Sequence, residues 1–484
     1  MVSQTADIKY ETVIGLEVHL QLSTDTKIFC GCANRFGAQP NTLTCPVCLG
    51  LPGALPVVNA RALEYAMKVG LALNCTVSPF VKFDRKNYFY PDCPKAYQIS
   101  QFDLPICRDG FVIVEQEGAV PRKIRINRAH LEEDAGKLVH DDTHNCSLVD
   151  YNRTGTPLME IVTEPDITSP QEAYDYLSTL KLTLRYLNVS DCDMEKGSLR
   201  CDANISIRPA GSQQLGTKTE LKNMNSFKAV KAGLEFEINR HRTVIESGQK
   251  IIQETRLWDE ARGMTSPMRS KEEAHDYRYF PEPDLVPFLM VESAIEEMRR
   301  SLPELPAQKR ERLISQYNLA AYDAGILVQD PGLAALFEEC ARHYQDTKKI
   351  CNWINGPLLK ELNARNASLA DIDLKPEELV HLMAKVDEGI VSNLAAKNVL
   401  HFVIDTGKSV DTIIKEKSLA QVSDDDTLEH LVHEVICEHD KIADQVRGGK
   451  ESAIGFLVGQ AMRKTQGKGN PKKIGEIIKK ALIP

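Results

Sequence analysis

Alternating polar and apolar residues mark one short segment of this chain as a candidate for chemistry. In Thr12–Leu22 the even positions from Ile14 onward are apolar, and the odd positions carry Glu17, His19 and Gln21. A period of two is typical of a β-strand with one face packed on a core, so these polar side chains share the other face. A carboxylate and an imidazole two residues apart can converge on one ligand. An ordinary half-exposed strand shows the same alternation, and only its recurrence favours a site.

The same alternation recurs twice further along the chain. Arg200–Arg208 places Asp202 and Asn204 on one face, and Lys218–Lys222 places Glu220 between two lysines. The short, glycine-containing connection between the two segments predicts an antiparallel hairpin.

Two more acidic residues lie between the first strand and this hairpin. Glu132 follows the basic, strand-like run Lys123–Arg128, and Glu160 is embedded in the apolar segment Pro157–Val162. A carboxylate in apolar surroundings is partly buried and needs a cation or a hydrogen-bond donor. Several strands therefore offer acids to one polar sheet face. Because hard cations take oxygen ligands, this predicts a magnesium and phosphate site.

Four cysteines have the spacing of metal ligands. A C-x-C pair and a C-x-x-C pair, separated by twelve residues, comprise Cys30, Cys32, Cys45 and Cys48. Two such pairs can close a tetrahedron of thiolates around zinc and leave no open position for water, so we expect a structural zinc site in an insertion near residues 30–48. Unpaired loop thiols are one alternative. A redox disulfide is another, weakened by the absence of a thioredoxin-like context.

Nucleotide binding has no phosphate-loop motif to rely on. Gly407-Lys408-Ser409 comes closest, but Phe402 occupies the position of the earlier glycine. The loop 83–98 is the better phosphate candidate, because guanidinium and ammonium groups meet phosphates and aromatic rings stack on bases. A solvated loop clamped by tyrosine packing is the alternative. The candidates in this loop and beside Glu220 are Arg85, Lys86, Tyr88, Lys95 and Lys218.

The elements that position these residues change character along the chain. Its length of 484 residues predicts two or three domains. Strand alternation dominates residues 1–293, which predicts a catalytic domain of the α+β class around a mixed or antiparallel sheet. Helical periodicity then takes over, so we expect an all-α domain over 294–405 and a small helical tail domain over 406–484.

The tail changes its charge abruptly. Residues 423–445 hold eight acidic residues, whereas residues 446–480 hold nine Lys or Arg against two Glu. A flexible basic loop between helices suits a folded RNA backbone. A merely solvated basic face is the default alternative. The expected RNA contacts are Arg463, Lys464, Lys468, Lys472 and Lys473.

Composition limits the classes of function. A hydrophobic content of 42% and a charged content of 26% are typical of a soluble globular protein. No apolar run approaches the roughly 20 residues that span a bilayer, so no membrane is expected. Thirteen cysteines and the lack of a secretory leader favour a reducing, cytoplasmic location. The net charge of -9 argues against a protein that coats nucleic acid over its whole surface, although a local basic patch remains compatible with it.

In their order along the chain, these segments resemble the GatB family, the B subunits of tRNA-dependent amidotransferases. The resemblance runs from about residue 11 to residue 290 and returns at Gly459–Lys468. The matching stretches are Glu11–His19, Cys45–Gly53, Phe83–Asp92, His130–Gly136, Asn152–Glu160, Gly197–Asn204, Leu221–Phe227 and Asp276–Asp284.

The resemblance implies a fold similar to the glutamine synthetase catalytic domain. It also implies that ATP and magnesium are used to phosphorylate the side-chain carboxylate of misacylated Glu-tRNA(Gln) or Asp-tRNA(Asn). Ammonia from a glutaminase, which is the A subunit, then displaces the phosphate, and the small C subunit completes a heterotrimer. The family's zinc site is variable, and this chain has all four cysteines. The implied catalytic residues are Glu17, His19, Glu132, Glu160, Asp202 and Glu220, the first four as magnesium ligands.

A noncatalytic, zinc-containing RNA-binding adaptor is the alternative from a different class. Both hypotheses explain the cysteines and the basic tail, but only the enzyme explains why acids gather on polar strand faces. The sequence leaves open which misacylated tRNA is used. It shows no Gly/Ser-rich amidase run, so the ammonia source is expected on another chain.

Overall fold

The computed structural model describes residues 9–116, 118, 120–141, 143–268, 277–420, 425–465 and 469–482. It divides into two compact units, Met1–Pro306 and Ala307–Pro484, and each is described by itself. The first unit contains the described strands and the second is helical, so the expected sheet domain followed by a helical region is confirmed.

A nine-stranded sheet organises the first unit. Its strand order is β14-β13-β12-β11-β1-β10-β7-β6-β2, and every neighbouring pair is antiparallel except the parallel pair β12–β13. Its strands are β1 (Tyr10–Gln21), β2 (Thr76–Val77), β6 (Cys107–Val114), β7 (Arg122–Glu133), β10 (Pro157–Thr163), β11 (Leu199–Pro209), β12 (Thr219–Lys222), β13 (Glu254–Asp259) and β14 (Met264–Pro267).

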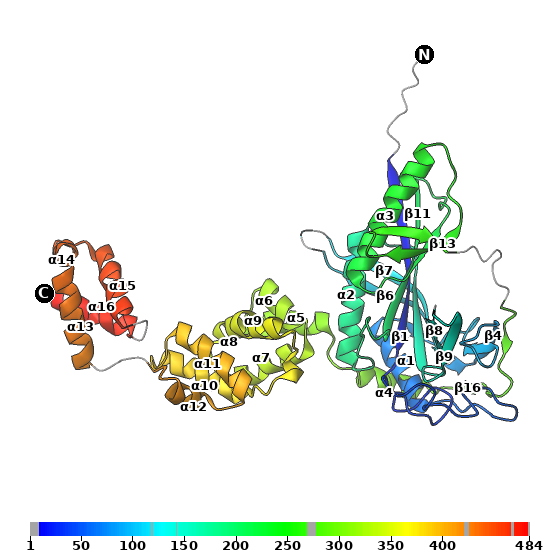
Figure 1. Ribbon diagram of the computed structural model, residues 1–484, viewed down its shortest axis with the longest axis horizontal. Coiled ribbons are helices and arrows are strands. Elements are labelled where there is room, and N and C mark those ends of the chain that lie inside the picture. The colour runs from blue at the N-terminus through cyan, green and yellow to red at the C-terminus, as the bar shows by residue number, and fades with distance from the viewer. Residues whose placement is uncertain are drawn as a thin grey trace, which may run out of the picture. The chain divides into compact units, whose positions relative to one another are not determined.

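One face of this sheet forms the core. Along β1, Ile14, Leu16, Val18 and Leu20 are fully buried, while the polar residues between them are partly exposed, as the alternation predicts. The apolar face is covered by helices, so that strands and helices share one hydrophobic cluster. Figure 1 shows two of these helices running along the sheet. The helices of this unit are α1 (Ala60–Ala72), α2 (Pro170–Leu187), α3 (Phe227–Glu246) and α4 (Glu292–Arg300).

Three small sheets complete the first unit. The segment 83–98, which the sequence predicts as a loop, is free of strand only at Phe83 and over 88–96, and the prediction is wrong toward its ends, where β4 and β5 pair as a β-hairpin. The physical reason is a long-range contact: a strand from near residue 280 pairs with the edge of the hairpin and satisfies its backbone groups. The remaining strands are β3 (Phe80–Val81), β4 (Asp84–Asn87), β5 (Tyr97–Ser100), β8 (Lys137–Asp141), β9 (Cys146–Asp150), β15 (Phe280–Pro281) and β16 (Phe288–Leu289).

The second unit has two hydrophobic clusters. One extends from Leu313 to Ile414 and the other from Leu428 to Leu482. Its elements are α5 (Pro306–Tyr317), α6 (Ala321–Leu327), α7 (Pro331–His343), α8 (Thr347–Trp353), the π-helix η1 (Ile354–Leu358), α9 (Leu359–Arg365), the 3-10 helix η2 (Leu369–Asp371), α10 (Pro376–Asp387), α11 (Asn393–Thr406), α12 (Val410–Glu416), α13 (Asp425–Glu438), α14 (Asp440–Arg447), the 3-10 helix η3 (Glu451–Ala453), α15 (Ile454–Lys464) and α16 (Pro471–Leu482).

The expected segment limits can be compared with these clusters. The limit near residue 293 falls at the start of α4, whose Ile295 packs in the cluster of the first unit. The limit near residue 405 falls at the end of α11, whereas Val410 and Ile413 of α12 pack in the first cluster of the second unit.

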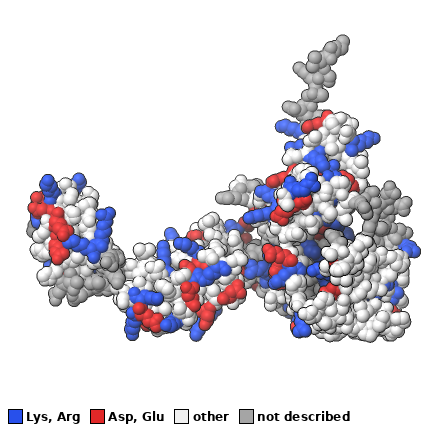
Figure 2. Space-filling model, viewed as in Figure 1, with Lys and Arg blue, Asp and Glu red and all other residues white. Residues whose placement is uncertain are grey.

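The surface of the second unit mixes charges of both signs. Figure 2 shows basic and acidic side chains close together over its helices. Within the part of the chain that the structure describes, no helix has the length and apolarity needed to cross a membrane.

Candidate active site

The central strands align four polar residues in one row across the sheet. His19 of β1 lies opposite Arg200 of β11 on one side and Glu160 of β10 on the other. Glu160 in turn lies opposite His130 of β7. Directly opposed residues of antiparallel strands have their side chains on the same face. The row therefore places two imidazoles, a carboxylate and a guanidinium on the polar face.

We call His19, Glu132 and Glu160 the inner cluster. Their ligand atoms all lie within 4.8 Å of one another, and the two carboxylates are buried. His19 Nε2 is 3.4 Å from Glu160 Oε2, and Ser100 Oγ donates a hydrogen bond of 3.4 Å to Glu132 Oε2. Two carboxylates and an imidazole from three strands converge on one point, which is a donor set that fits a divalent cation.

The surroundings shift the pKa values of these three groups in different directions. Burial raises the pKa of Glu132 above its usual range. Burial also acts to raise the pKa of Glu160, but the contact with His19 and the charge of His130 lower it overall. Burial acts to lower the pKa of His19, yet Glu160 and Glu132 raise it. His19 and the charge of Lys86 thus lower the pKa of both acids and oppose the effect of burial. For Glu132 this lowering is smaller than the rise caused by burial.

Glu17, Asp202 and Glu220 form a second group, the outer cluster. Glu17 lies opposite Asp202 in the sheet, and Lys222 Nζ bridges the other two acids at 2.5 Å from Asp202 and 3.1 Å from Glu220. Asn204 Nδ2 donates a 2.9 Å hydrogen bond to Glu17. Burial, together with the charges of Glu160, Glu220 and Asp202, raises the pKa of Glu17. The two clusters therefore share one electrostatic environment.

A cavity of about 290 Å³ adjoins the outer cluster. Glu17 and Asn204 line it from the sheet, and Lys218 lines it from the segment before β12. The rest of its wall includes Gly15 and Val162, which leave backbone and apolar surface facing the cavity. An acid, an amide, an amine and an apolar wall can accommodate a polar ligand that also has a flat apolar part.

Among the described residues, only some of the basic residues predicted for phosphate binding lie beside the cavity or the clusters without a carboxylate partner of their own. Lys218 lines the cavity, but Arg85 forms ion pairs with Glu282 and Asp284. Lys95 forms an ion pair with the buried Glu133.

The other two candidates lie nearer the inner cluster. Burial acts to lower the pKa of Lys86, but the charge of Glu132 raises it overall. The ring of Tyr88 makes an edge contact with Tyr277, and burial raises the pKa of its hydroxyl. The structure therefore brings Lys218 beside the outer cluster and Lys86 beside the inner one, while Arg85 and Lys95 are neutralised by protein carboxylates.

Sequence reasoning missed His130 as a site residue. Its Nε2 lies 3.9 Å from the nearest carboxylate oxygens of both Glu132 and Glu160. Its Nδ1 is buried and has no hydrogen-bond partner among the described residues. Burial lowers the pKa of this imidazole to about 4. The signal was present in the sequence, because His130 stands two residues before Glu132 on the same strand face.

The four cysteines also converge. The sulfur atoms of Cys30, Cys32, Cys45 and Cys48 all lie within 4.8 Å of one another. A fully buried lysine, Lys27, places its Nζ 3.8 Å from Cys48 Sγ and 2.7 Å from the carbonyl oxygen of Leu43. The contact with Cys30, aided by the charge of Lys27, lowers the pKa of Cys48 to about 5. Nothing in the sequence pattern marked Lys27 as part of this site.

Four of the five predicted RNA contacts lie on two helices of the tail. Arg463 and Lys464 end α15, and Lys472 and Lys473 begin α16. Lys464 forms ion pairs with Glu434 and Glu438 of α13, at 3.2 and 2.6 Å, so part of its charge is neutralised. Lys468 lies outside the described residues.

Known proteins match this chain over almost its whole length. A family model described as the GatB/GatE catalytic domain matches residues 12–296, and one described as the GatB domain matches residues 335–482. A protein of Thermoanaerobacter sp. (strain X514) is 54% identical over 98% of this chain and 100% of its own length. One of Thermodesulfovibrio yellowstonii is 53% identical with the same coverage. Each is named as the B subunit of aspartyl/glutamyl-tRNA(Asn/Gln) amidotransferase. The chain therefore belongs to the GatB family.

Proposed function

We infer that this chain is the B subunit of a tRNA-dependent amidotransferase, a C–N bond-forming ligase that makes Gln-tRNA(Gln) or Asn-tRNA(Asn). The family match and the names of the relatives support the overall activity. The observation that carries the chemistry is the inner cluster, where His19, Glu132 and Glu160 converge from three strands. An adaptor that only presents tRNA to another enzyme has no need for such a cluster.

The proposed reaction has two steps. A side-chain carboxylate oxygen of the tRNA-bound glutamate or aspartate attacks the γ-phosphorus of ATP, the bond to the bridging oxygen breaks, and ADP leaves. Ammonia then attacks the acyl carbon, and phosphate leaves with one of the ammonia protons. Division into two steps is needed because an unactivated carboxylate offers ammonia only an oxide leaving group.

Magnesium would be held by Glu132, Glu160 and His19 of the inner cluster and by Glu17 of the outer cluster. The chemistry that magnesium supplies when bound is neutralisation of charge on the oxygens of the transferred phosphoryl group. Imidazole is an unusual partner for so hard a cation, so His19 acts at least in part by orienting Glu160, with which it is in contact.

The cavity beside Glu17 is proposed to take the nucleotide. Lys218 at its wall offers a cation to a phosphate, and the apolar wall offers a surface to a base. Lys222 forms ion pairs with both Asp202 and Glu220 and so links these two acids of the outer cluster. Arg85, Lys86, Tyr88 and Lys95 stay candidates for contacts with ATP or the substrate carboxylate, with Lys86 favoured by its position near Glu132.

Further assignments rest on the family and on geometry. The sheet domain is proposed to share the fold of the glutamine synthetase catalytic domain, and the cysteine cluster is proposed to bind structural zinc. The proposed partners, in the cytoplasm, are a glutaminase, which is the A subunit, together with the small C subunit. Exposed apolar residues after the cysteine cluster, Leu51, Leu55 and Val57, offer a surface for a partner. The tail is proposed to bind tRNA.

One assay separates the enzyme from the adaptor. The chain is purified with its partner subunits and incubated with ATP, magnesium and Glu-tRNA(Gln) or Asp-tRNA(Asn). The enzyme releases phosphate only when charged tRNA is present, and mass spectrometry of the aminoacyl group shows the acid converted to the amide. Tight tRNA binding without phosphate release would instead identify an adaptor.

A further inference from the structure

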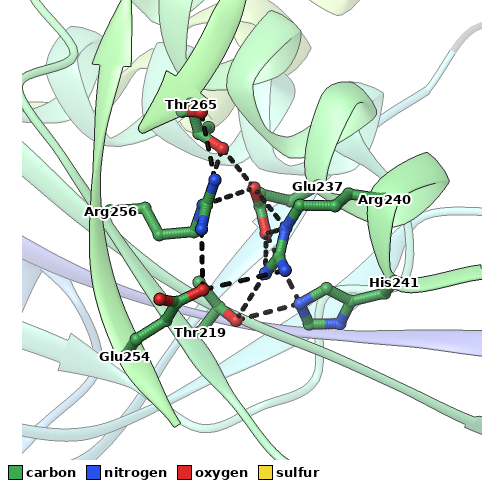
Figure 3. Close-up of polar contacts among 7 residues, drawn as sticks. All are labelled: Thr219, Glu237, Arg240, His241, Glu254, Arg256 and Thr265. Carbon is green, nitrogen blue, oxygen red and sulfur yellow. Dashed lines mark hydrogen bonds and ion pairs between the residues drawn. The ribbon is translucent and has the colours of Figure 1, made fainter. Parts of the chain in front are cut away.

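A second polar network lies on the opposite side of β12 from the outer cluster. It contains seven residues from α3 and from three neighbouring strands at one end of the sheet, and Figure 3 shows Glu237 near their centre. We call it the α3 network, and its members are Thr219, Glu237, Arg240, His241, Glu254, Arg256 and Thr265.

Glu237 is the centre of this network. Its side chain is fully buried, and Arg240 donates to it at 2.8 and 3.0 Å. Arg256 lies 3.2 Å away, and the Thr265 hydroxyl donates at 2.5 Å. Burial acts to raise the pKa of Glu237, but its partners, above all His241, lower it to about 2.

Thr219 ties this network to β12. Its Oγ1 shares a 2.9 Å hydrogen bond with His241 Nε2 and accepts one of 3.2 Å from Arg240. Glu254 accepts a 2.7 Å bond from Arg256 of the same strand, and the ion pair between Arg240 and Glu254, at 3.7 Å, links α3 to β13 as well. Two guanidinium groups balance two carboxylates, so the network needs no ion from outside the protein.

The strands of the network also carry the outer cluster. On β12 the network residue Thr219 precedes Glu220, which points to the other face. In the register of the parallel pair, Glu220 lies opposite Thr255, and the Thr255 hydroxyl donates to Glu220 Oε2 at 2.7 Å. A slip of one residue would exchange the two faces of a strand only four residues long.

We propose that the α3 network is a positioning device for phosphoryl transfer: it fixes the register of β12 and β13 and so holds Glu220, and through Lys222 also Asp202, in place. The proposal rests on the function inferred above. The network residues touch neither substrate nor cation, and they act through the strands. Buried groups in such a network have one arrangement in which their hydrogen bonds are made, which makes the register unique.

The test removes one hydroxyl at nearly constant volume. In the chain assembled with its partner subunits, Thr219→Val is compared with Thr219→Ser, which keeps the hydroxyl. Amidation of Glu-tRNA(Gln) with free ammonium is measured as magnesium is titrated. Asp202 lies opposite Glu17, a proposed magnesium ligand, and Asp202 and Glu220 both act on the pKa of Glu17. Displacement of these two acids in Thr219→Val should therefore raise the KM for magnesium about 10-fold, the scale for groups that orient metal ligands. The KM for tRNA should stay unchanged, and Thr219→Ser should restore the wild-type value.

Controls separate positioning from stability. Thr243→Val changes an exposed threonine of the same helix outside the network, and it should leave the KM for magnesium as in the wild type. If Thr219→Val lowers the thermal midpoint but keeps the wild-type magnesium dependence, the network is only structural and the proposal is overturned. If that variant does not fold, Thr265→Val and Thr265→Ser on β14 provide the same comparison two strands further away.

The wild-type arm reports on the proposed function. ATP-dependent amidation by the wild type with unchanged magnesium dependence in both valine variants would overturn only the positioning role. A wild type without ATP-dependent amidation would overturn the proposed function and this role with it.

Discussion

Glu132 and Glu160 lie on the neighbouring strands β7 and β10, two residues apart in the register. Their surroundings shift the pKa values of the two carboxyls in opposite directions. The pKa of Glu160 is lowered by its contact with His19, whereas burial raises that of Glu132. Glu160 is therefore charged at neutral pH, and Glu132 gains most from a nearby cation. The two acids therefore differ in how readily they ionise, and a bound cation would act mainly on the ionisation of Glu132.

This difference predicts that magnesium binding depends on pH. A carboxyl with a raised pKa is more fully ionised as the pH rises, so magnesium affinity should increase with pH over the range in which Glu132 loses its proton and level off above that range. Isothermal calorimetry in buffers of different ionisation enthalpy should also detect proton release on binding. Affinity that stays constant as the pH rises from the ordinary value of 4.5, with no proton release, would contradict an ionisation of Glu132 coupled to the metal.

The cysteine cluster makes a separate prediction about metal content. We expect about one zinc per chain, bound by four thiolates, and its loss in the Cys45→Ser/Cys48→Ser variant. Loss of zinc should loosen the surrounding fold and affect the chemistry only indirectly. Elemental analysis of purified protein is the measurement, and Cys146→Ser, at an exposed cysteine outside the cluster, is the matched control. Wild-type protein without zinc would contradict the assignment.

At the scale of elements, local alternation predicted the strands that carry the site. Residues 12–22 alternate because one face of β1 is buried, and the hairpin of β11 with β12 forms as expected, with Asn204 opposite Glu220. The alternation is a property of each strand alone, so it can be recognised in the sequence without knowing which strands pair with one another.

The partners of each strand could not be read in this way. β1 pairs with both β10 and β11, which lie more than a hundred residues further along the chain, and this pairing puts His19 beside Glu160. Such pairing is decided by the packing of whole faces, which no local pattern records. The α3 network is still less visible, since His241 and Glu237 have the helical spacing of ordinary core residues. The hairpin in 83–98 was missed because its pairing partner is near residue 280.

The α3 network predicts a large effect on stability. Glu237→Gln should lower the free energy of unfolding by about 3 kcal/mol at pH 7, because it leaves buried guanidinium groups without their full countercharge. A carboxyl with a lowered pKa contributes stability above its ordinary value of 4.5, and this contribution is lost as the pH falls toward about 2. The difference between wild type and variant should therefore shrink in urea titrations below pH 4.5. A difference independent of pH would contradict the role of the charge.

The control for this variant lies on the same helix. Glu235→Gln changes an exposed carboxylate whose nearest cation, Lys231, is 4.0 Å away. Its unfolding free energy should stay close to that of the wild type at every pH, because an exposed ion pair contributes little.

At the scale of the whole molecule, we expect the tail to contribute to tRNA binding and not to the chemical steps. Removal of residues 421–484 keeps α12, whose side chains belong to the first cluster of the second unit, and deletes the last cluster. We expect a much higher KM for charged tRNA and little change in kcat. Binding of tRNA by the full chain should weaken with rising salt. If the shortened chain bound tRNA as tightly as the full one, the basic residues of the tail would be only a solvated surface.

The central claim is that the inner cluster activates the carboxylate before ammonia is needed. The most direct measurement is amidation of Glu-tRNA(Gln) by the assembled complex carrying Glu132→Gln, with Glu195→Gln, at an exposed acid, as the control. The variant should lose at least ~100-fold in amidation, the scale for removing a positioned electrostatic group. Glutamine hydrolysis by the partner should continue, and free ammonium should not restore amidation. Amidation at the wild-type rate, or its rescue by ammonium, would contradict the account.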